Sequence, residues 1–582
     1  MFQALAFVVI DELHAFLDSE RGVQLASLLR RLDARTGRRA RRIGLSATIG
    51  NLSLAAAWLN PGGPSAVHRI ESHAISAPLQ LQIRGAQEPI DDENVPNAEQ
   101  PPQSSEQVAE HLFKIMRGKG NHLIFAGSRR NTEILSDKLR SMCAEAGVPN
   151  EFFPHHGNLS KETRESLESR LKEGVLPTTA VCTTTLELGI DIGSVESVAQ
   201  VGAPASISSF RQRLGRSGRR EGSASVVRIY VSEQKLDANS SLFSRLRVET
   251  VQAVAAVQLL LRRWVEPPQA GKLHFSTLLH QTLSVIAERG GVSAQAAFKL
   301  LGGTGPFVGT SPALFADLLR AMSSREDKLV EQAPDGTLML GKLGERLTSN
   351  YDFYSVFVTY DEYTIVTESK TLGTLSVTNA LGPGDYLIFG GQRWQVREID
   401  DKSKRVLVDP APAGRVPKFD GEAAPLHDEL LAEMRKVYLS SDEPAFLNAA
   451  AKDYLAEGRN EFRSLELDKR STALLNQRIH LLPWVGTQKL DTLRLALRYC
   501  GLQVEQSRIA VSVAADSGTI LQGALQQLAV SAPSPDALAL MSETLRSAKY
   551  DYLLSDELLR FQFSKNRLDF EALAAACKLL MQ

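Results

Sequence analysis

The stretch Phe7-Val8-Val9-Ile10-Asp11-Glu12-Leu13-His14 predicts a short buried strand that ends in two adjacent acids. Four consecutive apolar residues form the strand, and the carboxylates follow where it stops. In open parallel sheets, ligands bind at the carboxyl edge of the strands. The sequence therefore predicts a site at a sheet edge in which Asp11 and Glu12 face the metal-bound phosphates of a nucleotide.

Two further stretches place small polar residues at predicted strand ends. Ser46-Ala47-Thr48 comes one predicted strand after His14, and Thr183-Thr184-Thr185 precedes Gly189 and Asp191. Strand-end hydroxyls and glycines let a backbone approach phosphate groups closely. Asp191 is a candidate to bind a ribose hydroxyl or to tie this loop to nearby arginines.

A basic segment follows, Gln212-Arg213-Leu214-Gly215-Arg216-Ser217-Gly218-Arg219-Arg220. In a helix, Arg216 and Arg219 lie one turn apart, so both guanidinium groups can point at one anionic target. An arginine delivered across a domain cleft stabilises charge on a transferred phosphoryl group. A solvated basic surface is the alternative for this segment alone, but the chain order of all the stretches favours one shared site.

The composition excludes several classes of protein. The 582 residues have a net charge of −1, which argues against a uniformly basic nucleic-acid coat but leaves room for local basic surfaces. Four scattered cysteines have the spacing of neither a zinc site nor a disulfide framework, so a reducing cytoplasm is the expected location. No apolar run is long enough for a membrane span, and we expect no membrane partner.

The pattern of predicted strands and helices divides the chain into six parts. Strands and helices alternate in 1–75 and in 106–235, as in parallel α/β domains, and a polar, proline-rich linker at 76–105 separates them. Residues 236–350 have the outline of helices with a winged helix, and 351–424 are β-rich like a small barrel. Residues 425–582 are helical by periodicity and give no chemical signal.

With two intervening segments, 124–130 and 155–160, these stretches resemble superfamily 2 DEAD/DEAH-box helicases, and most closely the Lhr (large helicase-related) branch. Residues 11–14, 46–51, 186–193 and 212–218 are similar to its motifs II, III, V and VI. The likeness is strong over 7–231 and weaker to about 425. It implies a partial first and a complete second RecA-like domain. It also implies an ATP-dependent 3′-to-5′ translocase on single-stranded DNA that unwinds duplexes, including RNA:DNA hybrids, and is linked to repair.

The resemblance implies roles for particular residues, with ATP and Mg²⁺ as cofactors and single-stranded DNA or an RNA:DNA hybrid as partner. The catalytic residues are expected to be Glu12, Arg216 and Arg219, and Asp11 is expected to hold Mg²⁺ through water. The nucleotide-binding residues are expected to be Asp11, His14, Gly189, Asp191 and Gln212. The nucleic-acid contacts are expected to be Ser46, Thr48, Arg129, Gly157, Thr184 and Thr185.

The sequence departs from the family in one respect. No phosphate-binding loop of the form G-x-x-x-x-G-K-[ST] precedes Asp11. The near match at 336–343 has Leu343 where a hydroxyl is needed, and we interpret it as the hairpin of the winged helix. Three explanations remain: an upstream segment, a separate chain that supplies this half, or a degenerate helicase that only binds nucleic acid. The intact second-half motifs favour a truncated or split motor that is inactive alone.

Two other features are candidates for nucleic-acid contact. Seven arginines between Arg30 and Arg42 could line a phosphate track, although a basic connection is also common for solubility. Trp264, Trp394 and Trp484 could stack on bases, but each is expected to be a core or interface residue. A rival hypothesis is an ATP-independent DNA-binding or partner-docking subunit that uses residues 236–582.

Overall fold

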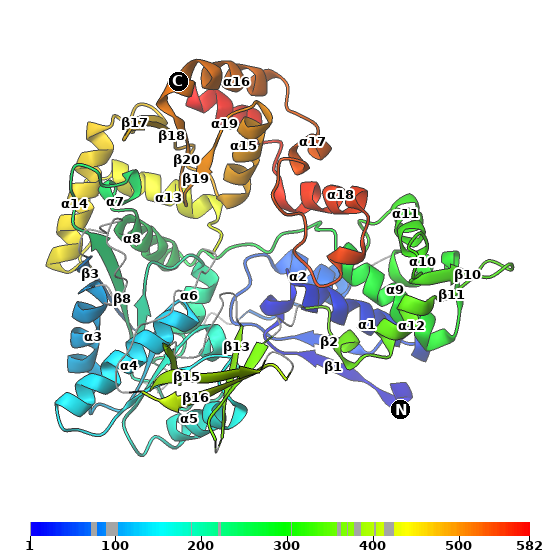
Figure 1. Ribbon diagram of the computed structural model, residues 1–582, viewed down its shortest axis with the longest axis horizontal. Helices are drawn as coiled ribbons and strands as arrows, with labels where there is room; N and C mark the ends of the chain where they lie inside the picture. Colours follow the sequence, from blue (N-terminus) through cyan, green and yellow to red (C-terminus); the bar gives the residue numbers. More distant parts are fainter. Residues whose placement is uncertain are drawn as a thin grey trace.

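The computed structural model describes residues 2–71, 78–88, 103–187, 189–218, 223–303, 305–357, 362–368, 370–376, 386–390, 392–400, 403–411 and 424–581. Figure 1 shows the chain coloured from the N-terminus to the C-terminus. A mixed α/β arrangement with a large parallel sheet forms its centre, as the sequence predicts. In the described residues, no helix has the length and apolar character that a membrane crossing requires.

The N-terminal part contains a small parallel sheet. β1 (Phe7–Ile10) pairs in parallel with β2 (Arg41–Gly44), and α1 (Glu20–Thr36) connects them. The Ser19 hydroxyl caps α1 by accepting from the Gly22 N–H at 3.2 Å, and α2 (Leu52–Leu59) follows β2. One face of the sheet is covered by a small apolar cluster, made up of Ile10, Leu13, Leu29, Ala55 and Leu59.

The centre of the molecule is a six-stranded sheet in which every pairing is parallel. Its strand order is β3-β8-β7-β4-β6-β5. The strands are β3 (Leu79–Glu88), β4 (Asn121–Phe125), β5 (Phe152–His155), β6 (Thr178–Cys182), β7 (Ser197–Val201) and β8 (Ser225–Gln234). β3 corrects the expected linker at 76–105, because its alternating Leu79, Leu81 and Ile83 face the core and its register with β8 is unbroken over all ten residues.

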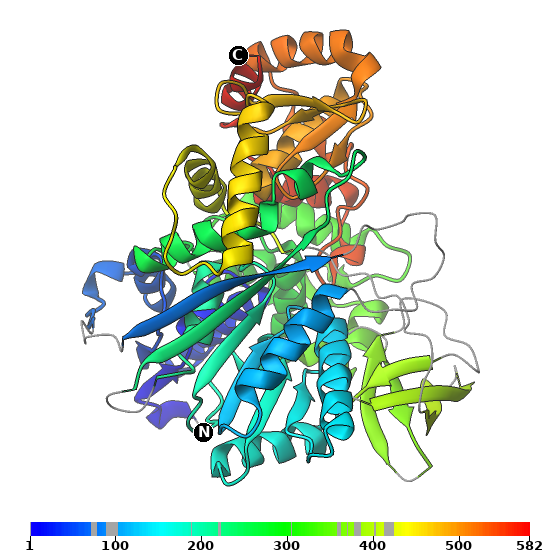
Figure 2. The ribbon, with the colours of Figure 1, turned by 90° about the vertical axis from the view of Figure 1, so that its left-hand side faces the viewer.

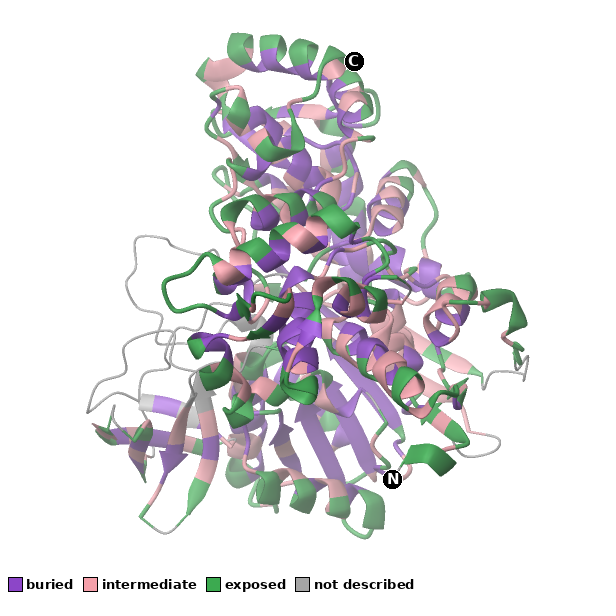
Figure 3. Cartoon of the chain, turned by 90° about the vertical axis from the view of Figure 1, so that its right-hand side faces the viewer, coloured by how far each residue is buried: buried purple, intermediate pink, exposed green. Residues whose placement is uncertain are grey.

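Helices cover both faces of this sheet, as parallel sheets require. On one face pack α3 (Gln103–Met116) and α4 (Arg129–Glu145), which stand in front of the strands in Figure 2. On the other face pack α5 (Lys161–Glu173), α6 (Ile207–Leu214) and α8 (Val248–Leu261). The short α7 (Leu242–Arg245) leads into α8. Figure 3 shows the strands between these layers as buried.

A helical unit follows α8 and contacts the N-terminal part. Its sheet has the order β10-β11-β9, an arrangement typical of a winged helix. Its elements are α9 (Phe275–Arg289), β9 (Val292–Ser293), α10 (Ala294–Leu301), α11 (Pro312–Ser323), β10 (Val330–Gln332), β11 (Thr337–Leu340) and α12 (Lys342–Thr348). The near match at 336–343 is therefore a hairpin strand and a helix start, as predicted.

A five-stranded sheet, with the order β13-β12-β16-β15-β14, packs against α4. Its strands are β12 (Glu362–Val366), β13 (Thr371–Ser376), β14 (Tyr386–Phe389), β15 (Gln392–Asp400) and β16 (Arg405–Pro410). Backbone bonds attach it to the loop after β5: Ser160 N–H donates to the Leu372 carbonyl at 2.9 Å, and Thr374 N–H donates to the Asn158 carbonyl at 2.7 Å. The β-rich prediction for this region holds for the described residues.

The C-terminal region differs from the helical expectation, because it contains a four-stranded antiparallel sheet of order β17-β18-β20-β19. The strands are β17 (Thr472–Leu475), β18 (Arg478–Leu481), β19 (Glu505–Gln506) and β20 (Val511–Ala514). The helices are α13 (Asp428–Leu439), α14 (Ala449–Ser464), α15 (Thr487–Tyr499), α16 (Gly518–Val530), α17 (Pro535–Ala539), α18 (Asp556–Arg567) and α19 (Leu573–Leu580). Such short strands give little periodicity to detect.

Candidate functional site

The acidic pair lies directly after β1, at the carboxyl end of the strand. Glu12 adopts the left-handed conformation, with φ 49° and ψ 46°, which costs energy for a non-glycine residue and is concentrated at functional sites. Its N–H donates to the Asp11 carboxylate at 2.9 Å, and Asp11 itself is exposed. The described residues contain no group of three or more metal-ligating side chains. The two neighbouring carboxylates of Asp11 and Glu12 suit Mg²⁺, which keeps several waters and binds one or two carboxylates together with phosphate oxygens.

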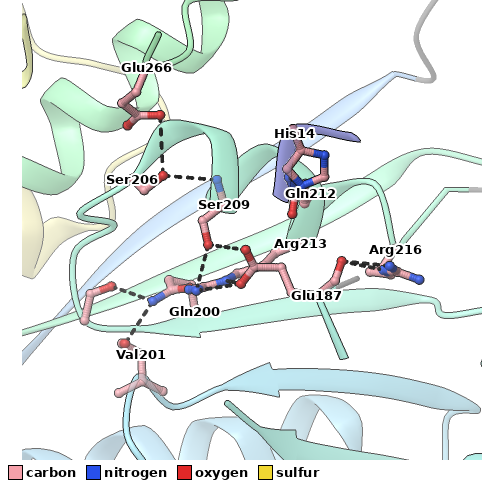
Figure 4. Close-up of polar contacts among 11 residues, drawn as sticks. His14, Glu187, Gln200, Val201, Ser206, Ser209, Gln212, Arg213, Arg216 and Glu266 are labelled. Atoms are coloured by element: carbon pink, nitrogen blue, oxygen red, sulfur yellow. Dashed lines mark hydrogen bonds and ion pairs between the residues drawn. The ribbon is translucent and has the colours of Figure 1, made fainter. Parts of the chain in front are cut away.

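A chain of hydrogen bonds connects motif II to motifs III and VI, which follow strands of the two different parallel sheets. The Gln212 amide donates to His14 Nε2 at 2.6 Å and to Thr48 Oγ1 at 3.0 Å. Because His14 Nε2 accepts, the ring proton lies on Nδ1, which is 2.9 Å from the Ser46 hydroxyl. Figure 4 shows His14 and Gln212 facing one another from different parts of the chain. Four residues predicted separately are thus in direct contact.

Motifs V and VI are joined by a buried ion pair. The Glu187 carboxylate accepts from Arg213 Nε at 3.0 Å and from an Arg213 terminal nitrogen at 2.9 Å. Arg213 also donates to the Gln200 side chain and lies over the Phe125 ring at 4.9 Å. The Ser209 hydroxyl donates to the same carboxylate (Figure 4). Arg213 is therefore held within the protein and is not available to a phosphate track.

Arg216 is buried and donates to backbone carbonyls of the motif V loop. Its bonds run to the Glu187 carbonyl at 2.7 Å and 3.2 Å and to the Ile190 carbonyl at 3.0 Å. In this structure the guanidinium thus fixes the loop that carries Gly189, whose φ is 50°. Asp191 is exposed and pairs with Lys172 at 2.9 Å, which is a lysine where the sequence suggested an arginine. Arg219 lies outside the described residues.

The expected nucleic-acid contacts of the second sheet lie at the carboxyl ends of three adjacent strands. Arg129 begins α4 just after β4, Gly157 follows β5, and Thr184 and Thr185 follow β6. Arg129, Gly157 and Thr184 are exposed. The Thr185 hydroxyl is 2.8 Å from His155 Nδ1. Because parallel strands end at one edge, these residues form a polar rim there.

Behind this rim, His155 and His156 of the segment 155–160 each contact an acid that the sequence does not single out. His155 Nε2 is 2.9 Å from Glu168, and burial lowers the pKa of His155 although this carboxylate raises it. His156 Nε2 is 2.6 Å from Glu133, whose carboxylate also accepts from the Gly390 N–H at 2.8 Å. The rim is therefore connected to the five-stranded sheet through buried polar contacts.

Glu266, in the segment after α8, was also missed. Its carboxylate accepts from the Ile207 N–H at 2.5 Å and from the Ser208 N–H at 2.8 Å, so it caps the N-terminus of the motif VI helix. A side chain on Gly50 would come within 2.3 Å of the Glu266 carbonyl. This segment therefore contacts motif III and motif VI together, and only the three-dimensional fold reveals it.

The arginine run and the tryptophans serve mainly in protein contacts. Arg31 and Arg35 pair with Glu288 of α9, at 2.6 Å and 2.9 Å, so these two arginines have protein partners in this structure. Trp394 is buried and donates to the Phe389 carbonyl at 2.7 Å. Trp484 is buried against Tyr438. Both tryptophans are core residues, as expected.

Comparisons with known proteins show which families the chain is similar to. The family model for the DEAD/DEAH box helicase matches residues 1–55, and that for the helicase conserved C-terminal domain matches residues 106–221. The chain is 28% identical over 464 residues to the Lhr helicase/probable uracil glycosylase of Mycolicibacterium smegmatis, covering 72% of this chain and 29% of that protein. It is 27% identical over 452 residues to the ATP-dependent helicase Lhr-Core of Saccharolobus solfataricus, covering 74% of this chain and 48% of that protein.

A solved structure shows the same fold. Mycobacterium smegmatis helicase Lhr bound to ssDNA and AMP-PNP superposes with a TM-score of 0.67 at 22% identity, over 99% of this chain and 77% of that one. The chain spans less than half the length of the two curated relatives. The chain therefore contains segments that match the DEAD/DEAH box helicase and the helicase conserved C-terminal domain, and over about three quarters of its length it is similar to Lhr helicases.

Proposed function

We propose that this chain is part of an ATP-dependent translocase and helicase that acts on DNA. It would track single-stranded DNA and unwind duplexes or RNA:DNA hybrids, as a repair-related motor. The observation that carries the proposal is the Gln212 bridge to His14 and Thr48, because it links the acidic pair to motif VI. A bridge of this kind could couple the state of the nucleotide to the relative position of the two sheets.

The proposal includes a phosphate-binding half supplied by residues outside these 582, either upstream in the same polypeptide or on another chain. Exposed apolar side chains on the small sheet support it: Phe7 is 55% exposed, Val9 58% and Ile43 37%. Parallel strands are otherwise covered on both faces, and their free edges are paired or protected. Further parallel strands at the edges of this sheet, with their helices over the exposed face, would bring a phosphate-binding loop to the carboxyl end of β1.

ATP with Mg²⁺ would supply the transferable phosphoryl group and the metal charge. Asp11 would hold the water shell of the ion, and the Glu12 carboxylate would accept a proton from the attacking water. Gly189 and Asp191 of motif V would contact the sugar and the phosphates of the nucleotide. Arg216 and Arg219 would stabilise the developing negative charge, which for Arg216 requires release from the Glu187 and Ile190 carbonyls. Through their hydrogen bonds, His14 and Gln212 would transmit a change at the nucleotide site to Ser46 and Thr48.

On the nucleic-acid side, the rim formed by Arg129, Gly157, Thr184 and Thr185 would contact backbone phosphates. Hydroxyls, backbone amides and arginine are the usual donors to phosphate oxygens, and they carry no sequence preference. Such contacts suit a motor that moves over any sequence.

The alternative is an ATP-independent DNA-binding or partner-docking subunit derived from such a helicase. The bonds of Arg216 to the motif V carbonyls favour it, because they occupy a residue that hydrolysis needs. This alternative predicts DNA binding that nucleotide does not change.

The deciding experiment measures ATP hydrolysis stimulated by single-stranded DNA. The 582-residue chain would be compared with the same chain joined to a segment that carries a phosphate-binding loop, each with a Glu12→Gln control. Hydrolysis only in the joined chain, abolished by Glu12→Gln, is the expected result. A joined chain that binds DNA and ATP without hydrolysis would refute the motor and leave the alternative.

A further inference from the structure

A cavity of about 920 Å³ lies in the C-terminal region, away from the helicase motifs. It is bounded by α15, by the loop that runs from α15 through β19 to β20, and by the segment after α17. Figure 1 shows these elements at the top of the molecule. The side chains that matter for its chemistry are Arg494, Arg498, Gln506, Arg508, Asp491 and Glu543.

Arg508 is a partly buried cation whose charge is poorly compensated. Its Nε is fully buried and has no hydrogen-bond partner among the described residues. Burial lowers the pKa of Arg508, and the carboxyl that counters this effect is Glu249. Burial in turn raises the pKa of Glu249 to about 7, so near neutral pH this carboxyl is only about half ionised. Arg508 therefore lines the cavity with a counter-charge that is only partly ionised.

The surrounding groups add donors and leave a positive excess. Arg494 and Arg498 lie one turn apart on α15; Arg494 is 3.8 Å from Asp491, and Arg498 is 3.1 Å from Glu543. These two carboxylates can therefore balance only two of the three arginines. The Gln506 side-chain oxygen is also buried without a partner in the described part of the chain. Gln506 and Arg508, two positions apart in the sequence, both line the cavity, and each has one buried polar atom without a partner in the described residues.

We propose that this cavity is a binding site for a phosphate group, with Arg508 as the principal ligand and Arg498 as the second. The planar fork of arginine matches phosphate oxygens in a bidentate manner, and desolvation strengthens such bonds. The phosphate can come from the backbone of a nucleic-acid strand or from a free phosphate or nucleotide. Binding of a phosphate group from nucleic acid rests on the proposed function, whereas binding of free phosphate or a nucleotide does not.

The experiment uses the full chain with Arg508→Gln and Arg498→Gln, and Arg560→Gln as the matched control. Arg560 lies in the same region but is paired with Asp536 at 2.6 Å, so its charge is already compensated. Binding of fluorescein-labelled oligothymidylate is measured by anisotropy over a range of salt concentrations. In parallel, thermal unfolding is followed with and without inorganic phosphate, and then with thymidine monophosphate.

For a nucleic-acid source, Arg508→Gln weakens oligothymidylate binding roughly tenfold and reduces the salt slope by about 0.7, the value for one lost phosphate contact on a single strand. For a free source, inorganic phosphate or the nucleotide raises the unfolding temperature of wild type and Arg560→Gln but not of Arg508→Gln. In either case Arg508→Gln without ligand is at least as stable as wild type, because an uncompensated charge has been removed.

Two results separate this inference from the proposed function. Wild type that fails to bind oligothymidylate but is stabilised by phosphate refutes DNA binding and supports the phosphate site. Wild type that binds oligothymidylate, with Arg508→Gln and Arg498→Gln unchanged in affinity, salt slope and phosphate response, overturns the phosphate site alone.

Discussion

Replacing Glu187 by glutamine tests whether the ion pair between motifs V and VI holds the second parallel sheet and α6 together. The side chain of Glu187 is 9% exposed and that of Arg213 is 13% exposed, so solvent screens the pair weakly. A glutamine at this position would keep the size and one acceptor but remove the charge. The Arg213 guanidinium would then remain against the Phe125 ring without its carboxylate.

The expected cost follows from this geometry. Removing one partner of a buried pair costs about 3–5 kcal/mol, because the other charge stays buried and uncompensated. Since glutamine retains one acceptor and Gln200 still accepts from Arg213, we place the effect near the low end, about 3 kcal/mol. That corresponds to roughly a 150-fold change in the unfolding equilibrium of this domain. Replacing both residues by methionine removes the stranded charge, so the double variant should lose less than Glu187→Met alone.

The assay is urea unfolding followed by hydrogen exchange of peptides from β6 and α6, which resolves this domain from the rest of a multidomain chain. Glu173→Gln, at an exposed position on α5, is the control and should change stability by less than about 0.5 kcal/mol. A change below about 1 kcal/mol for Glu187→Gln, or a double methionine variant less stable than Glu187→Met, would refute the reasoning.

Three further outcomes are expected. Gly373→Val should detach the five-stranded sheet and expose it to limited proteolysis, since a Cβ there would lie 2.1 Å from the Asn158 carbonyl; an unchanged digestion pattern would contradict this. Burial raises the pKa of Glu233 from 4.5 to about 8, so this group contributes most stability below 4.5 and loses it as the pH rises through 8. Unfolding free energy should therefore fall by about 2 kcal/mol between about pH 6 and about pH 8, and Glu233→Gln should flatten this decline. Gln212→Ala should speed hydrogen exchange around His14 and Thr48 roughly fivefold, in line with the loss of about 1 kcal/mol of hydrogen bonding; equal exchange rates would show that the bridge is not formed in solution.

The sequence predicts those site residues that lie in a distinctive local pattern. Asp11 follows an unmistakable apolar strand, and Gln212 lies in a segment whose arginine and glycine pattern is distinctive. Their neighbourhood could be inferred from motif order, but the direct bond between Gln212 and His14 depends on the placement of two separate sheets. Motif patterns therefore predict which residues lie in one site, and the structure shows which of their atoms form hydrogen bonds.

Other features could not be predicted because their partners are distant in the chain. The Gly390 N–H bonds to Glu133, 257 positions away, and no local pattern marks either residue. The hairpin between β17 and β18 turns at Asn476 and Gln477, which both have positive φ, without the glycine that normally signals such a turn. The sequence predicts a linker where β3 lies, because polar residues alternate with Leu79, Leu81 and Ile83 and the acidic, proline-rich residues that follow dominate the local composition.

The exposed apolar face of β1 and β2 has a practical consequence for handling this protein. Val9 and Ile43 are paired across the sheet and both are exposed, beside strand edges that offer free backbone groups. Such a surface favours self-association, either face to face or edge to edge. Purified material should therefore grow in particle size with concentration, and a binding partner that adds strands here should act as a solubilising agent.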